Sequence, residues 1–139
     1  MYTHLVDLFV RRAYEGFNRG DAERAVSRFG EQARLVFYGD SRLGVALNTK
    51  DDIREWLRRL MALGLRWEID DVVVSGPPWN TRLVTVFTVR LPQGGSYRGT
   101  QYARLRWGRV YLDEILPDTQ AVRQHFPPSA MPLSGTEDA

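Results

Sequence analysis

The sequence predicts an α+β domain: three helices, then a curved, mixed or antiparallel sheet that wraps around them, then a short C-terminal helix. In two segments before residue 64, apolar side chains recur every three to four residues, which is the period of an amphipathic helix. From residue 67 to residue 116, β-rich runs alternate with short turn sequences, which is typical of an antiparallel meander. Such a sheet coils, and helices that cover only part of its concave face leave a cone with a cavity at its open end.

Helix ends are marked by capping residues and glycines. Asp21, Thr49 and Asp118 each stand where a side-chain oxygen can accept the first free N–H groups of a helix. Gly20 and Gly64 stand where helices stop. The helices predicted in this way cover residues 5–17, 22–29, 50–61 and 119–126, and the predicted strands cover residues 33–38, 67–75, 82–91, 97–107 and 109–116.

Length and composition favour a single domain over residues 1–126, followed by a flexible tail over residues 127–139 that is rich in Pro, Ser and Gly. The chain has 139 residues and no cysteine, so disulfide and thiolate chemistry are excluded. It has no apolar run long enough to span a bilayer and no signal-peptide pattern at its start, which predicts a cytoplasmic protein without a membrane partner. The net charge is +2 and the arginines are interleaved with acids, so no nucleic-acid partner is expected.

The last two predicted strands divide their side chains between two faces, because side chains alternate along a strand. With a tight turn at Trp107–Gly108, one face is apolar and the other mixes aromatic and ionic groups. The apolar set is Ala103, Leu105, Val110 and Leu112, and the mixed set is Tyr102, Arg104, Tyr111 and Asp113. The mixed face is either an ordinary solvated surface or the wall of a polar pocket.

Four motifs together with the order of elements carry a family resemblance. They are the helix end Phe17-Asn18-Arg19-Gly20-Asp21, the segment Trp107-Gly108-Arg109-Val110 before the last strand, the loop Gly76-Pro77-Pro78-Trp79-Asn80-Thr81-Arg82 and the step Asp118-Thr119 into the last helix. With them the chain resembles the nuclear transport factor 2-like superfamily, and most of all its SnoaL-like group of small bacterial proteins. The resemblance covers about residues 4–126 and implies the ketosteroid isomerase-like cone fold. It does not fix the function, because the superfamily holds several kinds of enzyme and many proteins without catalysis.

The catalytic positions of related enzymes carry residues that cannot do the same work here. The aspartate of polyketide cyclases and epoxide hydrolases corresponds to Ile115, and the base of ketosteroid isomerases to about Phe37. The proton-donating acid of ketosteroid isomerases corresponds to about Tyr102. The epoxide hydrolase arginine and aspartate correspond to Val84 and Val86. The resemblance therefore implies that none of these mechanisms runs in its usual form.

By the same resemblance, Tyr102, Arg104, Asp113 and Ile115 point into the cone. Arg104 and Asp113 are then close enough for a charge-assisted pair. That pair is either a structural ion pair or a functional one, in which Arg104 holds a carboxylate, carbonyl or enolate oxygen and Asp113 orients it or accepts a proton. The predicted catalytic residues are Asp113 and Arg104.

Other side chains could also belong to the site, and most of them have a purely structural alternative. Asp40 is a possible base near the pocket mouth or a turn-forming residue, and Tyr38 is a possible ligand contact beside it. Trp56 and Trp67 either line the cavity or fill the core. The predicted ligand-binding set is Tyr102, Arg104, Tyr38, Trp56, Trp67, Phe37 and Ile115. The two histidines lie at opposite ends of the domain and no phosphate loop is present, so neither a metal nor a cofactor is expected.

Two functions of different kinds fit this reading. The first is proton transfer on a small apolar carbonyl compound, polyketide-like or terpenoid-like, as in an isomerase, cyclase or dehydratase. The second is a non-catalytic ligand-binding or assembly domain. A cavity below about 300 Å³ would argue against a steroid-sized ligand. The apolar strip Ala103, Leu105, Val110 and Leu112 is predicted to face away from the cavity and to form a homodimer, since a monomer rarely leaves such a patch in water.

Overall fold

A computed structural model describes residues 2–128 and residue 133. Its elements run α1 (Tyr2–Asn18), α2 (Ala22–Val26), β1 (Phe29–Phe37), β2 (Val45–Leu47), α3 (Lys50–Met61), β3 (Arg66–Ser75), β4 (Thr81–Arg90), β5 (Ser96–Arg106), β6 (Arg109–Pro117) and α4 (Thr119–His125). The six strands form one sheet in the order β2-β1-β6-β5-β4-β3. Strands β1 and β6 pair in parallel, and all the other neighbours are antiparallel.

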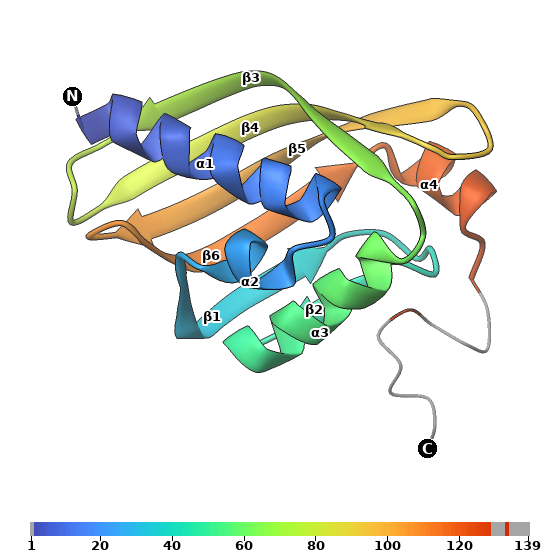
Figure 1. Cartoon of the computed structure of the whole chain (residues 1–139), viewed down its shortest axis with the longest axis horizontal. Coiled ribbons are helices and arrows are strands. Elements are labelled where there is room, and N and C mark those ends of the chain that lie inside the picture. The colour runs from blue at the N-terminus through green and yellow to red at the C-terminus, as the bar shows by residue number, and fades with distance from the viewer. Residues whose placement is uncertain (1, 129–132, 134–139) are drawn as a thin grey trace.

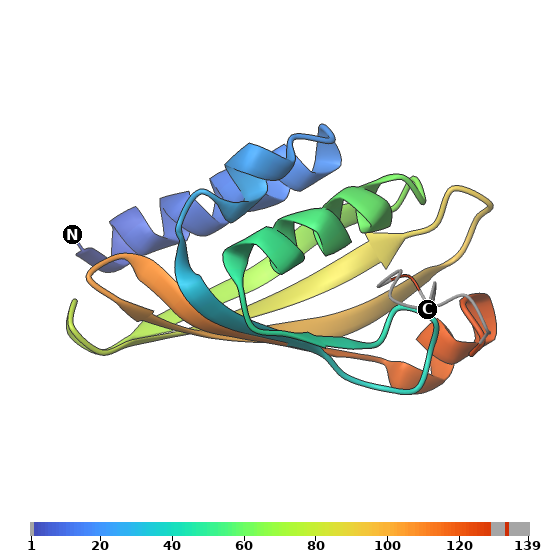
Figure 2. The same ribbon diagram turned by 90° about the horizontal axis from the view of Figure 1, so that it is seen from below.

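Helices α1, α2 and α3 lie on one face of the curved sheet, and α4 follows β6 at its end (Figures 1 and 2). The main core lies between α3, β1 and the middle of the sheet, where Phe37 packs on Trp56 with ring centroids 5.7 Å apart. A smaller core lies under α1, where Val6 and Val10 contact the sheet. In the part of the chain that the structure describes, no helix is long and apolar enough to cross a membrane.

The predicted α+β fold with an open curved sheet is confirmed. Thr49 and Asp118 cap α3 and α4, because their side chains accept the backbone N–H groups of Asp52 and Ala121. The second helix is shorter than predicted, since the chain is already extended in β1 from Phe29 onward. The three-residue strand β2 was not predicted, because it is too short to show a pattern and forms only by pairing with β1.

The division of side chains between the two faces of β5 and β6 was wrong. Near the turn, Leu105 faces Val110 as predicted, but the next pair joins Arg104 to Leu112, so Tyr111 is an extra residue on β6. Such a bulge leaves one residue unmatched and reverses the facing of every residue beyond it. Ala103 therefore stands opposite Asp113, on the inner face of the sheet, and Tyr102 stands opposite Glu114 on the outer face.

The apolar strip predicted for the dimer interface is wrong for the same reason. Ala103 and Leu105 are buried against Val6 and Val10 of α1, on the concave side of the sheet. Only Leu112 of the four strip residues lies on the outer face, opposite Arg104. The predicted tail falls mostly outside the described residues; Leu133, which is described, is buried against the core and its N–H donates to the carbonyl of Arg42.

Candidate functional site

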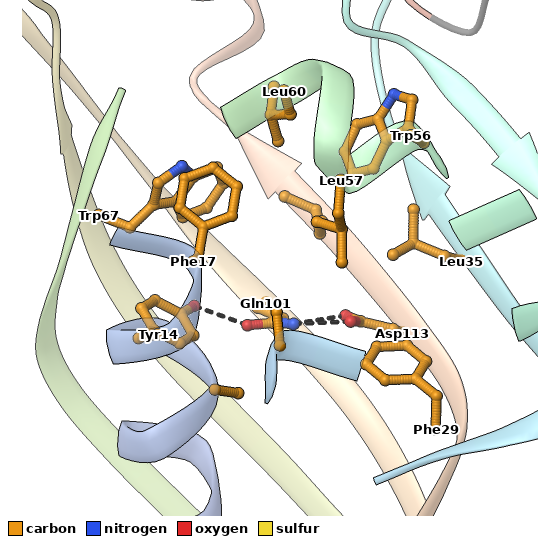
Figure 3. A pocket seen from close by; sticks show the side chains of 13 residues that line it. Tyr14, Phe17, Phe29, Leu35, Trp56, Leu57, Leu60, Trp67, Gln101 and Asp113 are labelled. Atoms are coloured by element: carbon orange, nitrogen blue, oxygen red, sulfur yellow. Dashed lines mark hydrogen bonds between the residues drawn. The ribbon is translucent and has the colours of Figure 1, made fainter. Parts of the chain in front are cut away.

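An apolar cavity of about 80 Å³ lies between the three helices and the inner face of the sheet (Figure 3). Almost all of its wall is aliphatic or aromatic, and the polar side chains in it are those of Tyr14, Gln101 and Asp113. Its other lining residues are Ala13, Phe17, Ala25, Phe29, Leu35, Trp56, Leu57, Leu60, Trp67 and Ile115. A dry wall with a few convergent polar groups is typical of a small-molecule site.

The three polar side chains form one hydrogen-bonded chain. The Tyr14 hydroxyl donates to Oε1 of Gln101 at 2.6 Å, and Nε2 of Gln101 donates to both carboxylate oxygens of Asp113 at 2.7 Å (Figure 3). Because Tyr14 engages the carbonyl oxygen of the Gln101 amide, the amide nitrogen is directed at Asp113. The chain thus holds one carboxyl group in a defined orientation at the wall of the cavity.

Asp113 is the chemically distinctive member of this chain. Its side chain is buried, with 2% of the residue exposed. Burial raises the pKa of its carboxyl to about 7, although the Gln101 hydrogen bonds oppose the rise; nearby Glu114 adds to it. The pKa of Tyr14 is also raised, by burial and by the negative charge of Asp113. A carboxyl that titrates near neutrality can both accept and donate a proton in the same pocket.

A second hollow of about 60 Å³ adjoins the first beneath α1. Tyr14, Gln101 and Asp113 line both hollows, so the hydrogen-bonded chain stands where the two meet. Arg28 and Ser27 lie in the wall of the second hollow, and the Arg28 guanidinium covers the Phe9 ring at 3.8 Å. Asp113 is therefore accessible from two sides within the domain.

Trp56 and Trp67 were predicted either to line the cavity or to fill the core, and both line the cavity. Both are also core residues, and their indole N–H groups are buried without an acceptor among the described residues. In Figure 3 both nitrogens lie at the end of the pocket away from Asp113. The structure thus leaves two buried donors without a protein acceptor in residues that line the cavity.

The other predicted site residues divide between the cavity and other places. Ile115 lines the cavity on the strand that carries Asp113, two residues further on. Phe37 is buried in the core without lining either hollow. The placement of Tyr102 and Arg104 in the cone is wrong, since the bulge at Tyr111 leaves both on the outer face.

The predicted contact between Arg104 and Asp113 does not form. The Arg104 guanidinium instead donates to Oδ1 of Asn80 at 2.7 Å and lies 5.9 Å from the centre of the Tyr111 ring. Without an arginine beside it, Asp113 lacks the positive charge that would lower its pKa.

Tyr38 and Asp40 also lie away from the cavity. The Tyr38 hydroxyl donates to Oε2 of Glu114 at 2.6 Å, and Glu114 is on the outer face of the sheet. Asp40 is an exposed loop residue whose carboxylate lies 3.0 Å from the Arg123 guanidinium. The position of Asp40 fits its turn-forming alternative and gives it no contact with the pocket.

Sequence reasoning missed Tyr14 and Gln101. Tyr14 lies at the helical spacing of the apolar residues Val10 and Phe17 in the first helix, and a tyrosine in such a position is normally taken as a core residue. Gln101 precedes Ala103 and Leu105 at the two-residue spacing of one strand face, and that spacing is the signal that could have found it. Within residues 2–128 and 133, no three His, Asp or Glu side chains come together as a metal site.

The fold and the pocket define a class of small α+β proteins with a curved sheet closed over by helices. The chain belongs to the SnoaL-like domain family, whose sequence profile matches residues 10–112. No functionally curated protein matches it.

Solved structures share the fold at low sequence identity. Bal32a, from a soil-derived mobile gene cassette, has a TM-score of 0.73 at 18% identity, over 91% of this chain and 98% of its own. A nuclear transport factor 2-like protein of unknown function from Burkholderia pseudomallei K96243 has a TM-score of 0.72 at 19% identity, over 88% of this chain and 97% of its own. A candidate polyketide cyclase from Xanthomonas campestris pv. campestris has a TM-score of 0.66 at 17% identity, over 89% of this chain and 98% of its own. Identities this low establish the fold and leave the activity open.

Proposed function

We propose that this protein binds a small apolar carbonyl compound in the cavity and that Asp113 transfers a proton on it, as in an isomerase, cyclase or dehydratase. The observation that supports this most is the single buried carboxyl with a pKa of about 7 in an otherwise apolar wall. A group with that pKa is partly ionised at neutral pH, so it can take a proton from carbon and return it to a neighbouring atom.

The size of the cavity favours a small ligand. About 80 Å³ is well below the 300 Å³ expected for a drug-sized or steroid-like molecule. A polyketide-like or terpenoid-like ligand would thus need to be a short one, or to extend into the second hollow past Tyr14 and Asp113. The unpartnered indole N–H groups of Trp56 and Trp67 add a preference for a ligand with an oxygen acceptor.

A direct test uses cyclohex-3-enone, whose isomerisation to cyclohex-2-enone is followed by ultraviolet absorbance. In this step a base removes a proton from the carbon between the carbonyl and the alkene, the double bond shifts into conjugation, and the proton is returned to the far alkene carbon. We expect catalysis above buffer by the wild type and a loss of about 10²–10⁴-fold in Asp113→Asn. Glu114→Gln, which changes the neighbouring carboxylate on the outer face, is the matched control.

The alternative, a non-catalytic binding domain, is separated by measuring binding of the saturated analogue cyclohexanone. Leu60→Trp should fill the cavity and abolish binding in either case. Binding that depends on the cavity, together with no isomerisation by the wild type, would favour the binding domain. Isomerisation that is equal in wild type and Asp113→Asn would remove Asp113 from the mechanism.

We also propose a homodimer, through the outer face of the sheet. None of helices α1–α3 lies on that face (Figure 2), and it carries partly or fully exposed apolar side chains on neighbouring strands. They are Val73, Val84, Val86, Tyr102, Leu112 and Leu116. Sedimentation at micromolar concentration should show a mass near twice 16.0 kDa, and Val84→Glu should return it to the monomer. A wild-type monomer at that concentration would contradict this interface.

A further inference from the structure

The outer face carries a distinct group of side chains at the end where the β3–β4 and β5–β6 turns lie side by side (Figure 1). Basic and aromatic residues from three strands and both turns meet there. The hairpin-end patch consists of Trp79, Arg82, Arg104, Arg106, Trp107, Arg109 and Tyr111. We propose that this patch docks the protein on the anionic phospholipid headgroups of a membrane surface.

The arginines of the patch oppose one another across the sheet. Arg82 stands directly opposite Arg104, and Arg106 stands directly opposite Arg109. Like charges in directly opposed positions destabilise a sheet. No described acidic side chain forms an ion pair with any of these four arginines. An external anion at this place would relieve the repulsion.

At the other end of the same sheet, a carboxylate of the protein itself lies beside a pair of directly opposed arginines. Arg66 and Arg90 are also directly opposed, but Nε of Arg90 lies 2.9 Å from a Glu68 carboxylate oxygen. The segments 76–82 and 104–112 hold no acid that could do this for the hairpin-end patch. The chain has 19 basic and 17 acidic side chains, and these segments hold four of the basic ones, so acidic side chains predominate in the remainder.

Two tryptophans form the tip of the patch. Trp79 is 58% exposed and Trp107 is 70% exposed, and their ring centroids lie 5.9 Å apart. Trp107 has a left-handed backbone with φ 53°, and its N–H donates to the carbonyl of Pro78 at 2.7 Å. A bulky residue in this conformation is strained, so the contact between the turns fixes two large apolar rings in solvent at a cost.

The geometry of the rings favours a lipid surface over single-stranded nucleic acid. Bases stack on open ring faces. Here the two indole rings are tilted by 45° and pack on each other, and the Arg106 guanidinium lies 4.2 Å from the centre of the Tyr111 ring. The two tilted rings in contact therefore present no pair of parallel open faces for stacked bases, and more than half of each tryptophan stays exposed in the same patch as the arginines. Tryptophan is enriched at the membrane interface, and each basic residue near an anionic surface adds to its attraction.

The sequence-based expectation of no membrane partner rested on the lack of a spanning segment, which a surface contact does not need. The expectation that the arginines are interleaved with acids does not hold for residues 104–112, which contain no acid, and the sheet brings Arg82 beside the three arginines of that segment. Trp79 contacts Trp107, but most of its surface stays exposed.

The test is sedimentation of the full chain with vesicles of phosphatidylcholine alone and of phosphatidylcholine with 30% phosphatidylglycerol. We expect binding to the anionic vesicles only, weakened by salt, and reduced at least about 10-fold in Arg106→Gln/Arg109→Gln. Arg19→Gln/Arg66→Gln, which removes the same charge from exposed positions outside the patch, should bind like the wild type. Tryptophan emission should shift to the blue on binding and should stop shifting in Trp79→Ser/Trp107→Asn, since Trp56 and Trp67 are already buried.

Asn is chosen at position 107 because it tolerates a left-handed backbone, and circular dichroism confirms that each variant is folded. Lack of binding by the wild type, equal binding to neutral vesicles, or equal loss in the two double arginine variants would overturn the proposal. Two further results would overturn the proposal by identifying a different occupant of the hairpin-end patch. Arginine-dependent binding of an oligothymidine without vesicle binding indicates nucleic acid. Protection of Trp79 and Trp107 from acrylamide in the free protein indicates that a second copy covers the patch.

Discussion

The two faces of the β5–β6 hairpin carry ionisable groups of opposite sign in opposite environments: a buried acid on the inner face and arginines near water on the outer face. On the inner face, a single carboxyl, Asp113, is buried with two hydrogen bonds from Gln101 and no cation. On the outer face, Arg104 and Arg106 each stand opposite another basic or apolar residue and remain near water. Burial shifts the pKa of the inner acid toward neutrality. The same hairpin thus separates the proposed proton-transfer group from the proposed surface for anions.

The bulge at Tyr111 is what separates these two chemistries, so a change that reverses the facing of the residues beyond it should have the largest effect. Deleting Tyr111 alone would leave Leu112 opposite Arg104 and Asp113 facing inward, whereas deleting Tyr111 and Leu112 together, with the turn kept, would direct Glu114 inward and Asp113 and Ile115 outward. Burying an unpaired carboxylate and exposing a core residue should cost more than about 4 kcal/mol of unfolding free energy. Urea unfolding measures it. Tyr111→Ser, which keeps the residue count, should cost about 1 kcal/mol through the lost cation–π contact with Arg106. Equal costs in the two variants would show that the bulge does not set the facing.

The next effect concerns the pH dependence of stability. The pKa of Asp113 is about 7 in the folded protein against 3.8 when unfolded, so the folded state holds a proton that the unfolded state releases between these values. Stability is therefore highest below pH 4 for this group and falls as pH rises to about 7, by roughly 4 kcal/mol. Asp113→Asn should remove this fall, and Glu114→Gln should keep it. Parallel stability curves for wild type and Asp113→Asn would show that the carboxyl is not perturbed.

Loss of the Gln101 amide should change both the pKa of Asp113 and the free energy of unfolding. Since its hydrogen bonds lower the pKa of Asp113, Gln101→Leu should raise that pKa above its wild-type value, as read from the carboxyl ¹³C shift during titration. The ionised carboxyl left without donors should cost about 1–3 kcal/mol above its pKa. Tyr14→Phe leaves the amide in place and should cost less, about 1 kcal/mol, because only one hydrogen bond is lost. A pKa that moves down in Gln101→Leu would contradict the role given to the amide.

The smallest effect is expected on the outer face. Arg104→Leu removes one of two directly opposed arginines together with a hydrogen bond to Asn80, so the change in unfolding free energy should stay within about 1 kcal/mol of zero. The repulsive part should be largest at low salt, where Arg104→Leu should gain relative to the wild type. Thermal unfolding at two salt concentrations measures both. A loss above about 3 kcal/mol would instead mean that Arg104 neutralises a buried acid.

The sequence by itself determined the elements of this fold. Apolar periodicity placed α1 and α3, the side chains of Thr49 and Asp118 marked where helices begin, and turn residues separated β3 to β6. These features depend on residues close together in the chain, and their physical causes are local: side-chain spacing and the capping of free N–H groups. Asp113 and Ile115 were assigned to the cavity by the family resemblance, and Trp56 and Trp67 were assigned either to the cavity or to the core; all four line the cavity.

Only the tertiary structure decided which face each residue of β6 occupies. A single extra residue, Tyr111, put Asp113 on the inner face together with Ala103, whereas Arg104 and Tyr102 lie on the outer face. Nothing in the sequence around residue 111 marks a bulge, because its position depends on how β6 pairs with β1 and β5 at the same time. The partner of Asp113 likewise comes from another strand, and Tyr14 from a helix 87 residues before Gln101. Contacts between segments so far apart depend on the packing of the whole sheet, which no local pattern records.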